Sequence, residues 1–173
     1  MFAEMNSPIG KIRIYACDKG IIRICIGQTP PLKISYAPSS SRAKTLLEGA
    51  LKELSEYFAG ERCEFTVPVN PQGTDFELKV WNAVKRIPYG ETRTYKDIAA
   101  EIGSPRAFRA VGNALSRNPV PILIPCHRVV RSNGKLGGYT AGIKVKKYLL
   151  ELEEKYKEKC KKRRDALDLN DPI

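Results

Sequence analysis

Residues 70–73, Asn-Pro-Gln-Gly, separate a stretch that contains both strand and helix patterns from one that opens with helix patterns, and this break restricts the folds open to the chain. Before this point, residues 11–17 and 21–26 alternate between apolar and polar side chains around a turn, which predicts a β-hairpin. After it, apolar residues recur three and four positions apart, as on one face of a helix. We therefore predict an α+β protein with a structural N-terminal domain at residues 1–73 and a mostly helical domain at residues 74–173.

The N-terminal domain is expected to contain one long helix and a further strand beside its hairpin. Leucines at helical spacing run through residues 42–58, and Gly60 follows as a stop signal. Residues 63–69 predict another strand, while the prolines and serines of residues 30–41 predict a loop. Nothing in this half of the sequence indicates chemistry.

The second domain opens with three predicted helices. Thr74 and Glu77 form a capping-box pair at the start of the first helix. Thr94 can cap the second helix and Ser104 the third, because each hydroxyl can accept a free backbone N–H of a first helical turn. Two short helices joined through Gly103 and Ser104 predict a helix-turn-helix, so we expect a winged-helix-like DNA-binding domain.

Polar side chains that suit nucleic acid form one stripe on the third predicted helix. Arg106, Arg109, Asn113 and Arg117 fall on one side of it, opposite the apolar residues. Arginine and asparagine make the phosphate and base-edge contacts that DNA recognition uses. The alternative is a solvated face on an ordinary amphipathic helix.

The net charge of +11 is concentrated in the second domain. Residues 1–74 carry 9 basic and 7 acidic side chains, whereas residues 75–173 carry 21 and 12. This asymmetry favours a polyanionic partner, DNA first, although a basic surface without a specific partner has the same charge. The basic run at residues 155–164 is expected to be the solvated end of the last helix, with Cys160 exposed in it.

The cysteine and histidine counts exclude several classes of site. The five cysteines include no C-x-x-C pair, so neither a disulfide framework nor a zinc finger is indicated. His127 is the only histidine, which excludes a His-rich metal site and leaves one imidazole for catalysis. We find no apolar run of membrane length and no leader, which favours an intracellular protein.

A candidate nucleophile follows an apolar, proline-rich segment. The three prolines of residues 118–125 bar a helix or a central strand, so we expect a stiff extended segment that passes through the core and presents Cys126. A thiol reacts as its thiolate, and with a usual pKa of about 8.5 it needs a nearby base or cation. His127 can supply the base, directly or through a water, if a carboxylate or carbonyl orients its ring. Taken alone, a Cys-His pair is more often a buried cysteine beside a hydrogen-bonded histidine.

The run Ile124-Pro125-Cys126-His127-Arg128-Val129-Val130 closely resembles the active-site signature of the O6-alkylguanine-DNA alkyltransferases, also called methylated-DNA–protein-cysteine methyltransferases. The similarity runs without a gap from about residue 75 to about residue 154. The first 70 residues match only the general, ribonuclease-H-like layout of the family's variable N-terminal domain. The other matching segments are residues 89–95, 109–115, 118–119, 137–140 and 149–153.

This resemblance implies a suicide reaction in which Cys126 takes an alkyl group, such as methyl, from O6 of a flipped-out guanine in DNA. It implies that His127 acts as a base through a bound water and that Glu153 holds and polarises His127. Asn118 would hold the turn around the thiol, and Tyr95 would press on the target phosphate and donate a hydrogen bond to the guanine. The protein would act once, without cofactor or metal.

The resemblance also implies how DNA is bound. Arg109 would be the finger that fills the gap left in the base stack, in a complex formed at the minor groove of double-stranded DNA. The backbone of Cys126 and Val129 would read the exocyclic amine of the guanine, and Thr140 would lie near O6. We expect a monomer in the cytoplasm, or in the nucleus of a eukaryote. The other candidate contacts to DNA or substrate are Arg106, Asn113, Arg117, Arg128 and Tyr139.

Three other functions are open at this point. The first is a non-catalytic binder that flags alkylated DNA, but relatives of that kind lack the acceptor cysteine, which is present here. The second is a cysteine hydrolase that uses Cys126 and His127, which leaves the arginine stripe unexplained. The third is a helix-turn-helix regulator, which leaves the Pro-Cys-His-Arg segment unexplained.

Overall fold

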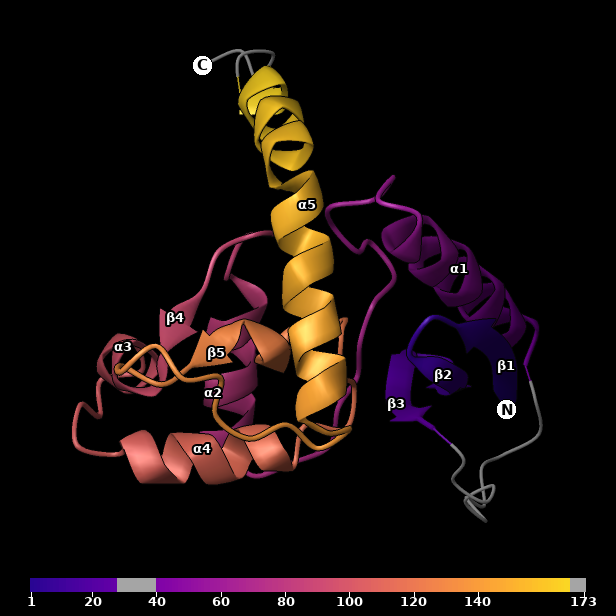
Figure 1. The fold of residues 1–173 in the computed structure, drawn as a ribbon. Coiled ribbons are helices and arrows are strands. Elements are labelled where there is room, and N and C mark those ends of the chain that lie inside the picture. The colour runs from indigo at the N-terminus through magenta and orange to yellow at the C-terminus, as the bar shows by residue number, and fades with distance from the viewer. Residues whose placement is uncertain (28–39, 169–173) are drawn as a thin grey trace.

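The computed structural model describes residues 1–27 and 40–168, and the chain forms a sheet with one helix beside a second, mostly helical unit (Figure 1). This arrangement confirms the predicted α+β class. The N-terminal sheet has three antiparallel strands in the order β1-β2-β3, and the predicted hairpin is β2 with β3. Their bounds are Phe2–Ser7, Gly10–Cys17 and Gly20–Ile26.

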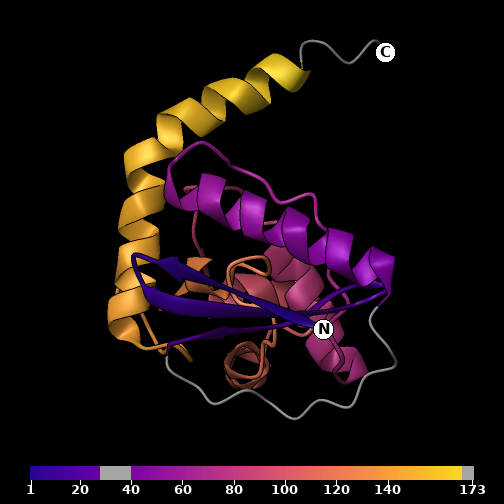
Figure 2. The same cartoon turned by 90° about the vertical axis from the view of Figure 1, so that its right-hand side faces the viewer.

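The predicted N-terminal helix is present as α1 (Ser41–Phe58), which packs against the sheet (Figure 2). Its N-terminus is capped by Ser40, whose hydroxyl accepts a hydrogen bond from the backbone N–H of Ala43 at 3.1 Å. Leu47 and Leu54 lie on its buried face. For the loop predicted at residues 30–41, residues 30–39 lie outside the part of the chain that the structure describes.

The strand predicted at residues 63–69 is wrong. Only one isolated bridge, between Ile21 and Val69, joins this segment to the sheet. The backbone N–H groups of Thr66 and Val67 donate instead to the carboxylate of Glu53, at 2.9 and 3.2 Å. Because these donors are used by a side chain of α1, they are not available to a neighbouring strand.

The helical unit follows from residue 75. The helix predicted at Thr74 is α2, and its capping box with Glu77 is present. The helix predicted at Thr94 is α3, which is likewise capped by its threonine. Two very short strands, β4 and β5, pair in parallel and bring the start of α3 beside the segment that follows Cys126. The elements are α2 (Asp75–Lys85), β4 (Arg93–Thr94), α3 (Tyr95–Glu101), α4 (Phe108–Ser116), the 3-10 turn η1 (Cys126–Arg128), β5 (Val129–Val130) and α5 (Ile143–Asp168).

The helix-turn-helix is formed by α3 and α4, but the predicted start of its second helix is wrong. Ser104 does not cap α4, since its carbonyl accepts the N–H of Ala107 at 2.8 Å and closes a turn before the helix. The helix begins at Phe108 and has no side-chain cap. The position of α4 comes from packing: the indole of Trp81 on α2 donates to the carbonyl of Ala114 at 2.9 Å.

The proline-rich segment before Cys126 is buried as expected, but it is not extended. The N–H of Ile124 donates to the carbonyl of Val120 at 2.9 Å, and Ile122 adopts a positive φ of 74°. The three prolines prevent a helix or strand without preventing a tight turn. The segment therefore folds into a turn within the core and carries Cys126 at its end.

The helix α5 runs past both units (Figure 1). A disulfide bond between Cys63 and Cys160 joins it to the segment that follows α1. The sequence predicted an exposed Cys160 and no disulfide framework, and both expectations are wrong: the side chain of Cys160 is only 3% exposed. Cys160 lies on the face of α5 that packs against the segment after α1, whereas the basic residues around it had predicted a solvent-exposed position. No helix in the described part of the chain is long and apolar enough to cross a membrane.

Candidate active site

Cys126 lies at the floor of a cavity of about 770 Å³ that opens beside the helix-turn-helix. Its lining includes Tyr95 at the start of α3 and Arg109 on α4, together with Tyr139 and Thr140 in the loop before α5. The side chain of Cys126 is 7% exposed. The sulfur is therefore covered on most sides but faces a space large enough for a small organic group.

A single asparagine fixes the turn that carries the thiol. The Nδ2 amide of Asn118 donates to the sulfur of Cys126 at 3.1 Å and to the carbonyl of Ile124 at 2.9 Å. Its Oδ1 accepts the N–H of Val120 at 3.0 Å. Burial raises the pKa of the Cys126 thiol, while the Asn118 amide and the positive charge of Lys146 oppose that rise.

His127 is fully buried behind the cysteine and contacts Glu153 on α5. Its Nε2 lies 2.7 Å from Oε1 of Glu153, whereas its Nδ1 has no hydrogen-bond partner among the described residues. An ionised carboxylate can only accept, so Nε2 carries the proton and Nδ1 is left as the basic nitrogen. Burial lowers the pKa of His127, and Glu153 offsets part of that effect.

Arg128 points inward to the same carboxylate and does not line the cavity. Its Nε donates to Oε2 of Glu153 at 2.9 Å and its Nη2 to Oε1 at 3.0 Å, while Nη1 donates to the carbonyl of Ile87 at 2.6 Å. Burial alone would raise the pKa of Glu153, but His127 and Arg128 outweigh it and hold that pKa well below its usual range. The expected DNA contact through Arg128 does not fit this placement, because its guanidinium neutralises a buried carboxylate.

Lys146 is a cation that the sequence analysis missed. Its side chain is fully buried, and its Nζ donates to the carbonyls of Val129 at 2.6 Å and Gly138 at 3.3 Å. Burial lowers its pKa to about 8, and its positive charge acts to lower the pKa of Cys126. Among its lysine neighbours Lys146 resembles a solvated residue, but it lies three and seven residues before Leu149 and Glu153, on the buried face of α5.

The cavity walls hold further polar groups near the sulfur. The hydroxyl of Thr140 donates to the carbonyl of Ser116 at 3.0 Å, which ties the loop to the end of α4. The hydroxyl of Tyr139 is buried and has no hydrogen-bond partner in the described structure. Gly137 has a positive φ of 75°, and a Cβ there would lie 2.5 Å from the hydroxyl of Tyr95, so glycine permits this close approach. Burial raises the pKa of Tyr95, which keeps its phenol protonated.

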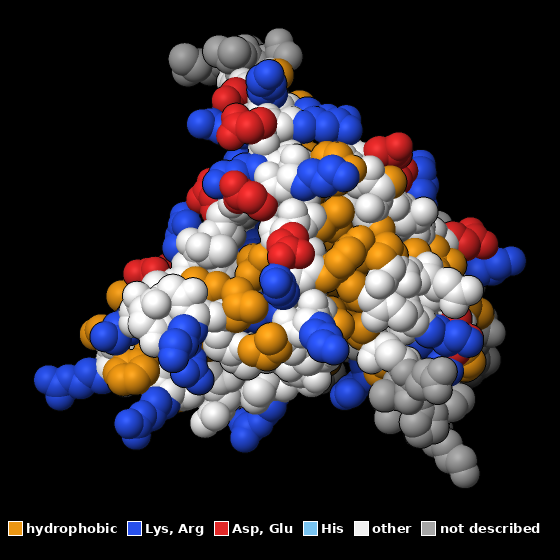
Figure 3. Space-filling view, viewed as in Figure 1, with side chains coloured by type: hydrophobic (Ala, Val, Ile, Leu, Met, Phe, Trp, Pro, Cys, Tyr) orange, Lys and Arg blue, Asp and Glu red, His pale blue; other side chains and the backbone are white. Residues whose placement is uncertain are grey.

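The structure places the other predicted contacts in different environments. Arg106 and Asn113 are exposed but lie outside the cavity lining, and Arg117 pairs with Glu77 at 3.1 Å. Val129 is buried, and its carbonyl already accepts one hydrogen bond, from Lys146. In Figure 3, Lys and Arg side chains stand out along the lower edge of the molecule, where Figure 1 places α4.

Two of the cavity-lining residues that the sequence analysis missed form an exposed pair of a cation and an aromatic ring. Lys96 and Phe108 line the cavity, and the ring of Phe108 is 38% exposed with the ammonium of Lys96 at 5.9 Å from its centre. The exposed aromatic ring was indistinguishable from a core residue in the helical pattern. Among the described residues, no group of three or more Cys, His, Asp or Glu side chains is placed to hold a metal ion.

Comparisons with known proteins cover both units of the chain. Residues 75–155 match the family model described as "6-O-methylguanine DNA methyltransferase, DNA binding domain", and residues 2–71 match "6-O-methylguanine DNA methyltransferase, ribonuclease-like domain". A methylated-DNA–protein-cysteine methyltransferase of Methanosarcina acetivorans is 46% identical over 154 residues, which is 88% of this chain and 97% of the relative. The constitutive enzyme of that name from Bacillus subtilis is 44% identical, over 91% of this chain and 98% of its own.

A solved structure has a similar fold. The crystal structure of Mycobacterium tuberculosis OGT in complex with DNA aligns with a TM-score of 0.79 and 42% identity, over 90% of this chain and 93% of that one. The fold of both units is therefore similar to that of a protein of known structure.

Proposed function

The chain belongs to the 6-O-methylguanine DNA methyltransferase family, and from this premise we propose that it repairs DNA by direct reversal, with transfer of an alkyl group from O6 of guanine to Cys126. The reaction is stoichiometric, because a thioether sulfur cannot be regenerated by hydrolysis under ordinary conditions. The substrate is double-stranded DNA that contains O6-alkylguanine.

The position of Cys126 is the observation that carries this proposal. Cys126 lines the cavity, and the next residue of the same turn, His127, is buried and hydrogen-bonded to Glu153. An alkyl acceptor needs both an open approach to the carbon and a base behind the thiol. The arrangement supports both requirements, since the cavity opens beside α4 and the base is part of η1.

We assign the first chemical event to the thiol proton. His127 takes it at Nδ1 through a bridging water, because Nε2 already carries the proton that faces Glu153. The Asn118 amide and the Lys146 ammonium stabilise the resulting thiolate, since the amide donates to the sulfur and both groups act to lower the pKa of Cys126. Glu153 stays ionised and stabilises the imidazolium that forms.

The alkyl transfer is then an in-line displacement at carbon. The sulfur of Cys126 forms a bond to the alkyl carbon as the bond from that carbon to O6 breaks, and the electron pair remains with the guanine. Tyr95 supplies a proton to the departing base, which leaves as ordinary guanine. Its phenol lines the cavity and is kept protonated by burial, which supports this role.

Access to the alkylated oxygen requires that the nucleotide leave the duplex. Rotation of the nucleotide costs a few kcal/mol, and the cost is lowest for a poorly paired base. We assign Arg109 to the gap left in the stack, because its exposed side chain stands on α4 at the cavity edge. Arg106, Asn113 and Arg117 contribute contacts to phosphates and sugars along the minor groove.

Two assignments complete the proposal. The backbone of Cys126 and Val129 reads the exocyclic amine of guanine, and Tyr139 and Thr140 border the alkyl group and O6. We also propose that the chain divides at residues 73 and 74 into a structural and a reactive domain and acts as a cytoplasmic monomer. The two family models, which meet between residues 71 and 75, support this division.

The test uses a duplex oligonucleotide with a single O6-methylguanine. The protein is incubated with it, digested, and the peptide that contains Cys126 is mapped by mass. We expect one methyl group on Cys126, at no more than one per protein molecule, and none in the Cys126→Ser variant. The Cys25→Ser variant is the matched control, because Cys25 is a free cysteine of the sheet and does not line the cavity.

Other results would contradict the proposal. Tight binding of the modified duplex without transfer would identify a lesion-binding protein. Repeated turnover on an ester or amide substrate would identify a cysteine hydrolase. Methylation of Cys17 or Cys25 in place of Cys126 would refute the assigned acceptor.

A further inference from the structure

A tyrosine of the N-terminal unit reaches the catalytic carboxylate. Tyr57, in the last turn of α1, is fully buried, and its hydroxyl donates to Oε1 of Glu153 at 2.7 Å. We propose that Tyr57 is a positioning residue for alkyl transfer, which holds the carboxylate oxygen that orients His127. The inference rests on the function proposed above and extends it to a part of the chain whose sequence indicated no chemistry.

The carboxylate of Glu153 accepts five hydrogen bonds, and only one of the donors lies on α1. Oε1 receives the hydroxyl of Tyr57, Nε2 of His127 and Nη2 of Arg128. Oε2 receives Nε of Arg128 and the N–H of Gly90. A carboxylate offers about four lone-pair positions, so these donors leave it little freedom to rotate. Tyr57 shares its oxygen with His127 and therefore acts on the bond that fixes the imidazole.

Tyr57 remains a donor under all working conditions. Burial raises its pKa well above the usual value, and the neighbouring charge of Glu153 raises it further. Its ring is also fixed, because it lies against the aromatic rings of Phe58, Phe65 and Tyr89 at centroid distances of 5.4, 5.4 and 6.0 Å. A fixed, protonated phenol is suited to hold an acceptor in place.

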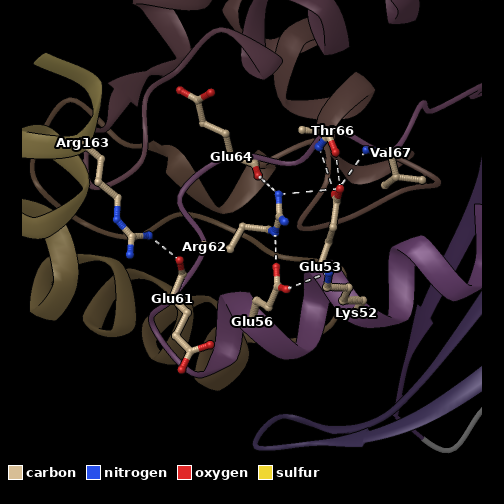
Figure 4. Close-up of polar contacts among 9 residues, drawn as sticks. All are labelled: Lys52, Glu53, Glu56, Glu61, Arg62, Glu64, Thr66, Val67 and Arg163. Atoms are coloured by element: carbon tan, nitrogen blue, oxygen red, sulfur yellow. Dashed lines mark hydrogen bonds and ion pairs between the residues drawn. The ribbon is translucent and has the colours of Figure 1, made fainter. Parts of the chain in front are cut away.

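The end of α1 is fastened to α5 close to this contact. Lys159 donates to the carbonyl of Gly60 at 3.1 Å, and Arg163 donates to the carbonyl of Glu61 (Figure 4). A Cβ on Gly60 would lie 2.4 Å from the ring of Tyr156, so the turn after α1 fits directly onto α5. These contacts hold Tyr57 at the level of Glu153, which lies on the same helix as Lys159 and Arg163.

The segment after α1 is also tied back to α1 itself. Arg62 donates to Glu56 at 2.7 Å and pairs with Glu53 at 3.6 Å, and Glu53 in turn accepts from the backbone of Thr66 (Figure 4). The disulfide at Cys63 closes the connection to α5. The hydroxyl of Tyr57 is therefore placed by a rigid assembly of both units and not by its own rotamer alone.

Removal of this hydroxyl has a definite electrostatic consequence. Oε1 of Glu153 would lose a donor and concentrate more negative charge on His127, which favours the imidazolium. The carboxylate would also be free to turn, so the ring would be oriented less well for Cys126. The titratable and charged groups around this pair are Cys126, Arg128, Lys146, Tyr89 and Tyr139.

The test compares Tyr57→Phe with Tyr89→Phe in the full-length protein. Phenylalanine keeps the ring and removes only the hydroxyl. Tyr89 is a matched control, since it is buried beside Tyr57 but its hydroxyl has no hydrogen-bond partner in the described structure. His127 is the only histidine, so a protein without an affinity tag and labelled with ¹⁵N-histidine gives the NMR signals of this one imidazole.

Two quantities are measured for each variant. For Tyr57→Phe we expect the pKa of the imidazole to move up by about 0.5 pH units and the rate constant of methyl transfer to fall about three- to tenfold, the scale of one hydrogen bond. Tyr89→Phe is expected to match the wild type in both. If either quantity in Tyr57→Phe stays at the wild-type value, or if Tyr89→Phe changes both equally, the proposal is overturned.

The proposed function and this inference can fail separately. If the wild type transfers no methyl group, the function is refuted on that result alone. The NMR titration still reports whether the hydroxyl of Tyr57 controls His127. Thermal melting of each variant confirms that the compared proteins are folded at the temperature of the assay.

Discussion

The carboxylate of Glu153 gives the sharpest test of the site, because so many buried groups depend on it. The change to consider is Glu153→Gln, which keeps the size of the side chain and removes its charge. The guanidinium of Arg128, 6% exposed, would then lose its counter-ion. The amide NH2 would also replace one of the two oxygens, so in either orientation at least two present donors would face a donor.

The size of the effect follows from this burial. Loss of one partner of a buried ion pair costs about 3–5 kcal/mol, because the other charge is left uncompensated. For a protein of this length each kcal/mol lowers the melting temperature by about 2–4 °C, so the variant should melt roughly 6–20 °C below the wild type. Glu154→Gln is the matched control. Its carboxylate is exposed and pairs only with Lys157 at 3.5 Å, so we expect a change of at most about 0.5 kcal/mol.

The pH dependence provides an independent check of the sign. The pKa of Glu153 is depressed in the folded protein below its usual value of 4.5. Its contribution to stability is therefore complete above pH 4.5 and is lost as the pH falls from there toward the folded-state pKa. The stability difference between wild type and Glu153→Gln should narrow by about 1.4 kcal/mol for each pH unit below 4.5.

The assay is urea unfolding followed by circular dichroism, at pH 7 and at two acidic pH values. Alkyl transfer is measured on the same samples and should be nearly abolished in Glu153→Gln. A stability loss below about 1 kcal/mol at pH 7 would refute the view that the carboxylate compensates a buried cation. A difference that widens toward acid would refute the assigned direction of the pKa shift.

Three further predictions follow from the same geometry. Cys160→Ser should lower the free energy of unfolding by about 2–4 kcal/mol, because the disulfide joins residues 97 positions apart, whereas Cys25→Ser should have little effect; melting with and without a reductant measures this. Arg109→Ala should slow transfer from duplex DNA about tenfold and change transfer from the free base O6-methylguanine less than twofold. The control is Arg23→Ala, at an exposed arginine of the N-terminal sheet outside the cavity lining, and equal losses of Arg109→Ala on both substrates would contradict the role of Arg109 in base extrusion. Lys146→Met should slow transfer at pH 7 about tenfold, because the pKa of Cys126 rises when the cation is removed. As the pH rises from about 8 to 10.5, the free energy of unfolding of the wild type should increase, because the pKa of Lys146 is lower in the folded protein than in the unfolded chain. Urea titrations of Lys146→Met should lack this increase.

Local sequence signals were enough to place several elements. The capping pairs at Thr74 and Thr94 involve residues three positions apart, so the helices that start there were predicted from sequence alone. The hairpin and α1 were predicted as well, because the spacing of apolar residues along one strand or one helix is also a local signal. The α4 start was wrong because Ser104 has the correct chemistry for a cap but closes a turn instead.

Long-range contacts could not be derived in this way. The resemblance to a family singled out Cys126, His127 and Glu153, and the structure brings these residues together. Tyr57 and Lys146 were missed, because their significance depends on the packing of helices that are distant in sequence. The partner of Cys63 was equally hidden, since a basic run on a helix gives no indication that one of its faces is buried.

The covalent link between Cys63 and Cys160 makes nearly the entire reactive half a closed ring. Arg131 and Lys135 are exposed in the loop beside the cavity and are natural targets for a trypsin-like protease. A cut there opens the ring but does not release a fragment, since each side of the cut keeps one end of the link. The nicked molecule would migrate as one band until it is reduced, and it would retain Cys126 and the helix that carries Glu153 in a single particle.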